Sequence, residues 1–118
     1  LRLELLLPES VVFGEAADVN GDFQVWLSLR DSKTGPPLAA LNQQLNRADE
    51  VFVLGLNAKD FIQQEDLQTN KTYTIQAYIL PGHGFVDAIA AKNASHFAFK
   101  SFEWSGANQT IQAEIQRR

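Results

Sequence analysis

Cysteine does not occur in the 118 residues of this chain, which excludes disulfide bonds, zinc-thiolate sites and thiol nucleophiles from this segment. Methionine is also absent, even at position 1, so we expect the sequence to be a processed form or one that omits its natural start. A signal peptide or lipidation site would then lie upstream of Leu1.

Every apolar run is far shorter than the ~18 to 20 residues of a membrane span, and we therefore expect this part of the protein to be soluble.

Positive charge is sparse and scattered along the chain. Ten Lys and Arg residues stand against fourteen Asp and Glu, and the one adjacent basic pair is Arg117-Arg118. A nucleic-acid-binding surface needs clustered Lys and Arg, so no nucleic-acid partner is expected. With 45% hydrophobic and 20% charged residues, the composition is typical of one globular domain, which we expect to span residues 1–118.

Alternating apolar and polar side chains predict β-strands. The clearest is residues 71–80, which are rich in β-branched and aromatic residues and are followed by a Pro-Gly-His-Gly turn. We expect residues 85–90 to return from that turn as the hairpin partner of this strand. Strands are also predicted at residues 1–7, 23–30 and 108–116. The side chains of strand 71–80 expected to face the core are Tyr73, Ile75, Ala77 and Ile79.

Three further segments give less regular patterns. Residues 51–56 are apolar on both faces, which favours a central strand over an edge strand. Residues 38–47 fit either a short helix or an extended edge segment, and the pattern leaves both open. Within residues 96–104 the aromatic side chains change phase, which implies a bulge near Ser101.

One brief helical turn is predicted after the strand at 51–56. Asn57 is a good capping residue for a turn over residues 58–64, where Phe61 and Ile62 would pack onto the core. Seven or so short strands with at most one or two such turns predict an all-β fold in a single domain. We favour an antiparallel β-sandwich over a closed barrel.

The titratable residues do not combine into a catalytic or metal-binding constellation. Residues 18–22 resemble the start of a calcium loop, but the Gly is fourth rather than sixth and Leu29 stands where such a loop has Glu. A plain turn is therefore favoured. His83 and His96 lack a second histidine at ligand spacing and a serine-acid pair, which favours solvated loop histidines. We expect no enzyme activity, no metal and no cofactor.

Several aromatic side chains are predicted on the strand face opposite to the main row of apolar side chains. They are the one feature of this sequence that is more than ordinary globular composition. They could cover a second layer, pack under residues 38–47 or shield the sheet surface, as apolar side chains of ordinary proteins do. Alternatively, they form a contiguous hydrophobic patch that receives a partner peptide. The residues predicted to form this partner-binding patch are Trp26, Tyr78, Phe102 and Trp104.

Several segments together resemble one family of small bacterial lipoproteins. Residues 7–11 read Leu-Pro-Glu-Ser-Val, and residues 23–31 form a strand pattern ending in Leu-x-Asp. Residues 52–56 read Phe-Val-Leu-Gly-Leu, Asp60 follows, and residues 73–79 read Tyr-Thr-Ile-Gln-Ala-Tyr-Ile. In this order the segments resemble the YscW/ExsB family, the β-sandwich pilotins of type III secretion systems, and the related YbaY-like domain.

This resemblance implies a domain at the periplasmic face of the bacterial outer membrane, tethered by a lipidated N-terminal Cys that this chain does not contain. There it would bind the C-terminal tail of the secretin subunit and assist localisation and assembly of the secretin ring. The tail would dock as a helix or as an added strand. A secreted or cell-surface adhesion or carbohydrate-binding β-sandwich, with Trp and Tyr stacking on sugar rings, is the alternative.

Overall fold

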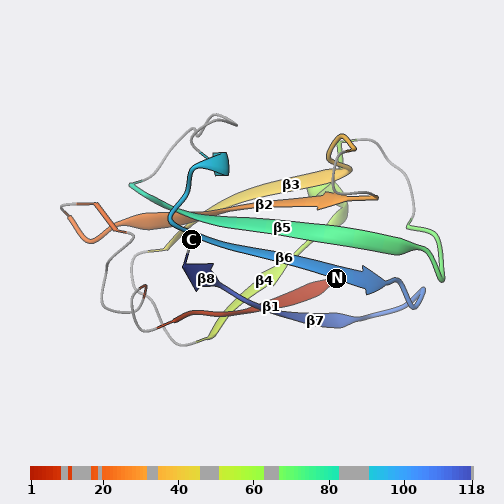
Figure 1. The fold of residues 1–118 in the computed structure, drawn as a ribbon. Helices are drawn as coiled ribbons and strands as arrows, with labels where there is room; N and C mark the ends of the chain where they lie inside the picture. The colour runs from red at the N-terminus through yellow and green to blue at the C-terminus, as the bar shows by residue number, and fades with distance from the viewer. Residues whose placement is uncertain are drawn as a thin grey trace.

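Two β-sheets lie face to face in the protein, which confirms the predicted all-β sandwich (Figure 1). A computed structural model describes residues 1–8, 11, 17–18, 20–31, 35–45, 51–62, 67–82 and 91–117. The smaller sheet has the strand order β4-β1-β7, and the larger has the order β3-β2-β5-β6-β8. The strands are β1 (Arg2–Leu6), β2 (Phe23–Arg30), β3 (Ala39–Leu45), β4 (Val51–Gly55), β5 (Thr72–Pro81), β6 (His96–Glu103), β7 (Thr110–Glu114) and β8 (Gln116–Arg117), with a 3-10 turn, η1 (Ala58–Asp60), after β4.

The central strand of the larger sheet is β5, which lies between β2 and β6 and pairs antiparallel with both. Its predicted core row is confirmed, because Tyr73, Ile75, Ala77 and Ile79 are all buried. The proposed hairpin partner, residues 85–90, lies outside the described residues, and both edges of β5 belong to other strands.

The core fills the space between the two sheets. Alternate residues of each strand point inwards, as the pleat of a β-strand requires. Each large apolar side chain that is fully buried contributes roughly 1.5 to 3 kcal/mol to folding. The largest apolar side chains with almost no exposed surface are Leu3, Leu5, Leu27, Leu29, Ile75, Ile79 and Ile115.

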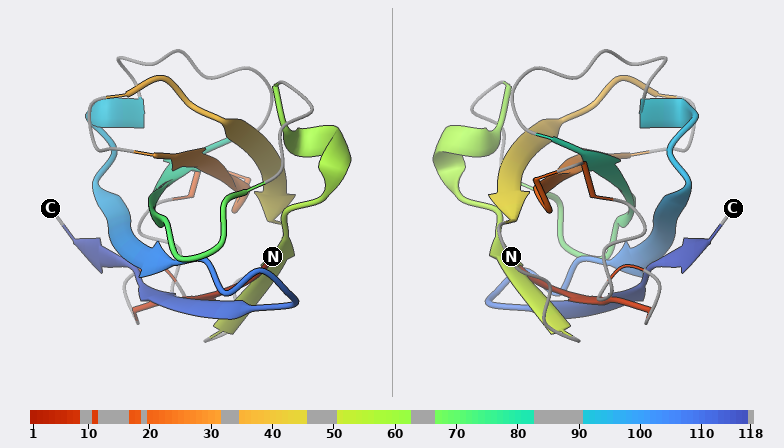
Figure 2. Two further views of the ribbon diagram at one scale, coloured as in Figure 1. Left: turned by 90° about the vertical axis from the view of Figure 1, so that its right-hand side faces the viewer. Right: turned by 90° about the vertical axis from the view of Figure 1, so that its left-hand side faces the viewer.

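One side of the sandwich is closed by the end of the chain. Strand β7 runs parallel to β1 in the smaller sheet, and the chain then crosses to the larger sheet, where β8 pairs with β6. Between them, Ile115 is buried and donates its N–H to the carbonyl oxygen of Leu6 at 2.8 Å. In the end-on views the two sheets therefore curve towards each other at β7 and β8 (Figure 2).

Two strand predictions change in the structure. Residues 39–45 form a strand, β3, at the edge of the larger sheet, which resolves the choice between helix and extended segment. Strand β4 was expected to be central but lies at the edge of the smaller sheet. Its second apolar row is exposed, since Val51 and Val53 each keep 44% of their surface accessible.

The predicted bulge in β6 is wrong. The register with β5 runs without interruption from Thr72 opposite Glu103 to Ile79 opposite His96. The apparent change of phase arises because aromatic residues occupy both faces of the strand: Phe102 is buried in the core, while Phe99 is exposed on the opposite face. A change of aromatic phase therefore does not by itself require an extra residue in the ladder.

Local chemistry explains two of the polar segments. The turn at residues 18–22 is confirmed, because Asp18 accepts hydrogen bonds through Oδ1 from the N–H groups of Asn20 and Asp22, and Gly21 has a φ of 81°. His83 lies outside the described residues. His96 is not a solvated loop histidine: its side chain is fully buried in β6, with Nδ1 2.8 Å from the hydroxyl of Ser95.

Candidate binding surfaces

The four aromatic residues predicted to form one patch lie in two separate places. Trp26 and Tyr78 lie on the outer face of the larger sheet, where they are cross-strand neighbours. Phe102 is part of the core between the sheets, and Trp104 packs against that core. The prediction placed Phe102 and Trp104 in the outward phase, whereas the unbroken register of β6 turns Phe102 inwards.

A row of aromatic rings crosses the outer face of the larger sheet, and we call it the outer aromatic row: Trp26, Tyr78, Phe97 and Phe99. The rings of Trp26 and Tyr78 are stacked, with centroids 5.9 Å apart, and Tyr78 meets Phe99 edge to face at 6.0 Å. Phe97 and Phe99 are 5.2 Å apart. Such ring contacts stabilise a sheet without any ligand, at roughly 0.5 to 1.5 kcal/mol per pair beyond area burial.

Much of this row is covered by the chain itself. Ala91 and Ala94 pack against Tyr78, of which only 5% remains exposed, and Trp26 is half-buried. Phe99, by contrast, keeps 50% of its surface accessible. The outer aromatic row therefore offers solvent one well-exposed ring rather than the broad patch that the sequence predicted.

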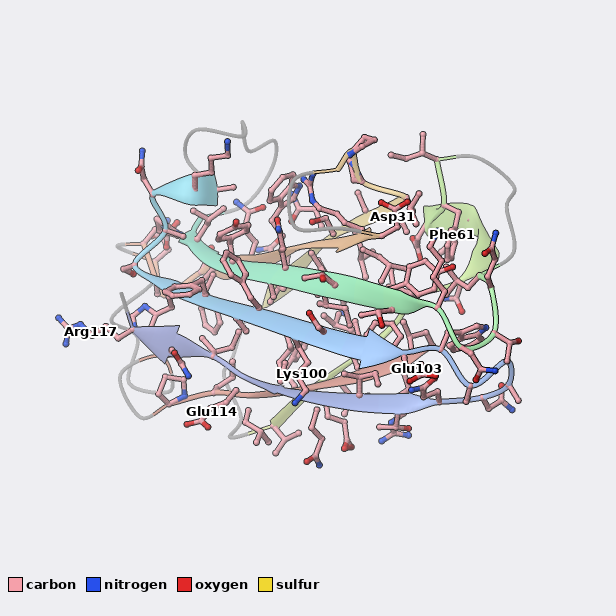
Figure 3. All side chains as sticks on the ribbon, turned by 45° about the vertical axis from the view of Figure 1, so that its right-hand side comes forward. Asp31, Phe61, Lys100, Glu103, Glu114 and Arg117 are labelled. Atoms are coloured by element: carbon pink, nitrogen blue, oxygen red, sulfur yellow. The ribbon has the colours of Figure 1, made fainter. Side chains whose placement is uncertain are left out.

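A pocket of about 340 Å³ lies at one end of the sandwich, beside the start of β3 and the residues that follow η1. Asp31 and Phe61, both of which line it, lie near each other at the same end of the molecule (Figure 3). Apolar side chains make most of its wall. The lining residues that we call the end pocket are Asp31, Pro36, Pro37, Leu38, Phe61, Ile62, Leu67, Gln68, Lys71 and Tyr73.

Backbone hydrogen bonds hold the two walls of the end pocket together. Ile62 donates its N–H to the carbonyl oxygen of Leu38 at 3.0 Å, and Phe61 forms an antiparallel bridge with Ala39. The turn before them is fixed because Asn57 donates its N–H to Oδ2 of Asp60 at 2.8 Å. The segment after β4 is thereby joined to the edge strand of the other sheet, and it presents Ile62 with 63% of its surface exposed.

The polar rim of the end pocket carries one charge of each sign. The Nζ atom of Lys71 lies 3.7 Å from Oδ2 of Asp31 and 5.7 Å from the centre of the Tyr73 ring. Both charged side chains are about two-fifths exposed, so this ion pair contributes little to stability. The hydroxyl of Tyr73 accepts a hydrogen bond from the N–H of Gln68 at 2.8 Å, which fixes the wall beside it.

The predicted residue Phe102 supports the end pocket from behind. Its ring centroid is 6.2 Å from that of Tyr73, its cross-strand neighbour, and Tyr73 lines the pocket. The sequence did not predict this pocket, because Phe61 and Ile62 were both expected to pack onto the core. Phe61 does pack against the core, whereas Ile62 is 63% exposed. The signals available in the sequence were the apolar pair Phe61-Ile62, directly before the polar residues 63–66, and the proline-rich residues 35–37.

The described residues hold neither a membrane-spanning helix nor a cluster of three or more His, Cys, Asp or Glu side chains. The end pocket itself is an apolar recess with a polar rim. Comparisons with protein-family models, with curated protein sequences and with solved structures give no match to this chain.

Proposed function

We propose that this protein is a non-catalytic binding domain of the pilotin type, which holds an apolar segment of the secretin subunit's C-terminal tail in the end pocket. In this proposal the domain works at the periplasmic face of the outer membrane, carried by an N-terminal lipid anchor, and assists localisation and assembly of the secretin ring. The proposed partner is the one that the sequence resemblance implies, and the end pocket is the proposed binding site.

The end pocket is the observation that carries the proposal. Its volume of about 340 Å³ lies at the small end of the roughly 300 to 1,000 Å³ typical of binding cavities. It therefore suits a few side chains of a protein segment. Ile62, which is 63% exposed on its border, offers apolar surface that a bound segment would cover, and the Asp31–Lys71 pair on the rim would orient the segment.

Replacing Ile62 with Asp tests this assignment. A charge at the apolar wall must be desolvated when the segment binds, so we expect the affinity for a synthetic secretin-tail peptide to fall at least about tenfold. Isothermal titration calorimetry gives the affinity directly. Val51→Asp is the matched control, because Val51 is also an exposed apolar residue but lies on β4 of the smaller sheet, away from the lining of the end pocket. Unchanged affinity in Ile62→Asp, or no binding to the unmodified protein, would rule the proposal out.

The outer aromatic row supports a second candidate function, a carbohydrate-binding module in which Phe99 and Trp26 stack on sugar rings. Under this function, Phe99→Ala removes the most exposed ring and is expected to weaken retention on an immobilised polysaccharide several-fold, while Ile62→Asp leaves it unchanged. Affinity electrophoresis in polysaccharide-containing gels measures both. Equal migration of all variants with and without polysaccharide would exclude the module.

A further inference from the structure

Among the described strands, β4 is an edge of the smaller sheet, and its five residues carry none of the usual protection against pairing. Natural edge strands carry charged side chains, prolines or bulges that prevent another strand from adding to them. Strand β4 reads Val-Phe-Val-Leu-Gly and has none of these devices. Its outer-face residues Val51 and Val53 are each 44% exposed, which makes them two of the most exposed large apolar residues in the described part of the chain.

The hydrogen-bonding groups that β4 presents at this edge follow from the ladder with β1. Leu56 donates its N–H to the carbonyl oxygen of Leu1 at 2.9 Å, and the amino group of Leu1 lies 3.4 Å from the carbonyl oxygen of Leu56. Bonded pairs alternate along an antiparallel ladder, so Leu54 and Phe52 also bond towards β1. The N–H and C=O groups of the three remaining residues, Val51, Val53 and Gly55, therefore point away from β1, and no other described strand meets them.

We propose that the β4 edge is a homodimerisation surface, on which a second copy of this chain adds its own β4 in antiparallel orientation. The three outward-bonding residues are evenly spaced around Val53. A two-fold axis at Val53 would therefore place Val53 opposite Val53 of the second copy, and Val51 opposite Gly55 of the second copy. This arrangement joins the two smaller sheets into one continuous six-stranded sheet.

Side-chain chemistry is compatible with this register. Val51 and Val53 of the two copies would form one apolar cluster on the outer face, since diagonal neighbours across antiparallel strands lie within reach of each other. Asp49 and Glu50 precede β4 in the sequence, and on β1 the side chains of Arg2 and Glu4 already pair at 3.6 Å. The two Glu4 residues would be separated by three strand spacings, about 14 Å, which exceeds the Debye length of ~8 Å at physiological ionic strength.

The limited length of the edge determines how strong the dimer is. Two five-residue edges with four valines bury less than the ~1,200 Å² at which standard protein interfaces begin. We therefore expect a reversible dimer that is populated only at high protein concentration. The β4 edge lies on a different sheet from most of the end pocket. A failure of the dimer proposal therefore does not affect the proposed function, and the reverse also holds.

Sedimentation velocity over protein concentrations from micromolar to millimolar tests the dimer. For the unmodified chain we expect the weight-average mass to rise from monomer towards dimer. Val53→Lys places a like charge on each side of the two-fold axis and should raise the dissociation constant at least about tenfold. Ile62→Lys, which adds the same charge at the end pocket, should dimerise as the unmodified chain does. Circular dichroism confirms that both variants are folded.

The absence of cysteine provides a second measurement that does not depend on a loss of association. Bonded pairs in an antiparallel ladder have Cα atoms about 5.5 Å apart, which is within the range for a disulfide. Mild oxidation of Val53→Cys should therefore give a covalent dimer. Glu114→Cys is the control, because Glu114 is exposed on β7 at the opposite edge of the same sheet (Figure 3). A chain that stays monomeric at millimolar concentration, or equal cross-linking of the two cysteine variants, would overturn the proposal.

Discussion

Replacing Leu27 with Ala is expected to destabilise the protein by about 2 to 5 kcal/mol, because it removes a fully buried side chain from the middle of the larger sheet. Leu27 lies between Leu41 of β3 and Ala77 of β5, and both neighbouring strands are fixed by long ladders. The surrounding structure therefore has little freedom to collapse into the cavity. Urea unfolding followed by circular dichroism measures the change as a shift in midpoint at constant m-value.

Leu41→Ala is the matched control for this prediction. Leu41 is the cross-strand neighbour of Leu27, but it lies on the edge strand β3 and is only partly buried. The same atoms are removed from a site that is already partly solvated, so we expect a clearly smaller loss than in Leu27→Ala. Equal losses in the two variants would show that the core is not centred on β2 and β5.

Replacing Gly106 with Ala is expected to cost about 2 to 4 kcal/mol, the sum of backbone strain and crowding. Gly106 has a φ of 88°, which is unfavourable for any residue with a Cβ atom. A Cβ atom built there would also lie 2.6 Å from Oγ1 and 3.3 Å from Cγ2 of Thr69. The free energy of unfolding of the variant measures both effects together.

Two further variants separate strain from crowding at Gly106. Gly21 has a similar φ of 81° with nothing near its Cβ position, so Gly21→Ala should cost only the strain, about 1 to 2 kcal/mol. In a Thr69→Ala background, Gly106→Ala should fall to the same cost, because the crowding atoms are gone. A double-mutant cycle with no coupling between the two positions would contradict the crowding argument.

Strands with strict alternation could be predicted from the sequence, and strands apolar on both faces could not be placed. The core rows of β2 and β5 follow from period-two patterning, since one face must leave water. Strand β4 shows the limit of this reasoning, because two apolar faces are compatible with a central strand and also with an edge whose outer valines stay exposed. The distinction depends on pairing partners from distant parts of the chain, about which local pattern carries no information.

The candidate sites were harder to predict because their residues meet only in three dimensions. Trp26 and Tyr78 do lie together, as alternation in two paired strands implies. The end pocket joins residues 31, 36–38, 61–62, 67–68, 71 and 73, and the bridge between Phe61 and Ala39 brings two of these segments together. No periodicity within any one of these segments indicates that bridge.

The parallel pairing of β1 with β7 has a consequence for how this chain is made. Strand β1 leaves the ribosome before the other described strands, yet its two neighbours are residues 51–55 and 110–114. The smaller sheet can therefore be completed only after residues 110–114 have been synthesised. Contacts of such long sequence separation slow folding, since loop-closure entropy must be lost before they form. Until then the backbone N–H and C=O groups of β1 lack the strands with which they pair in the folded domain.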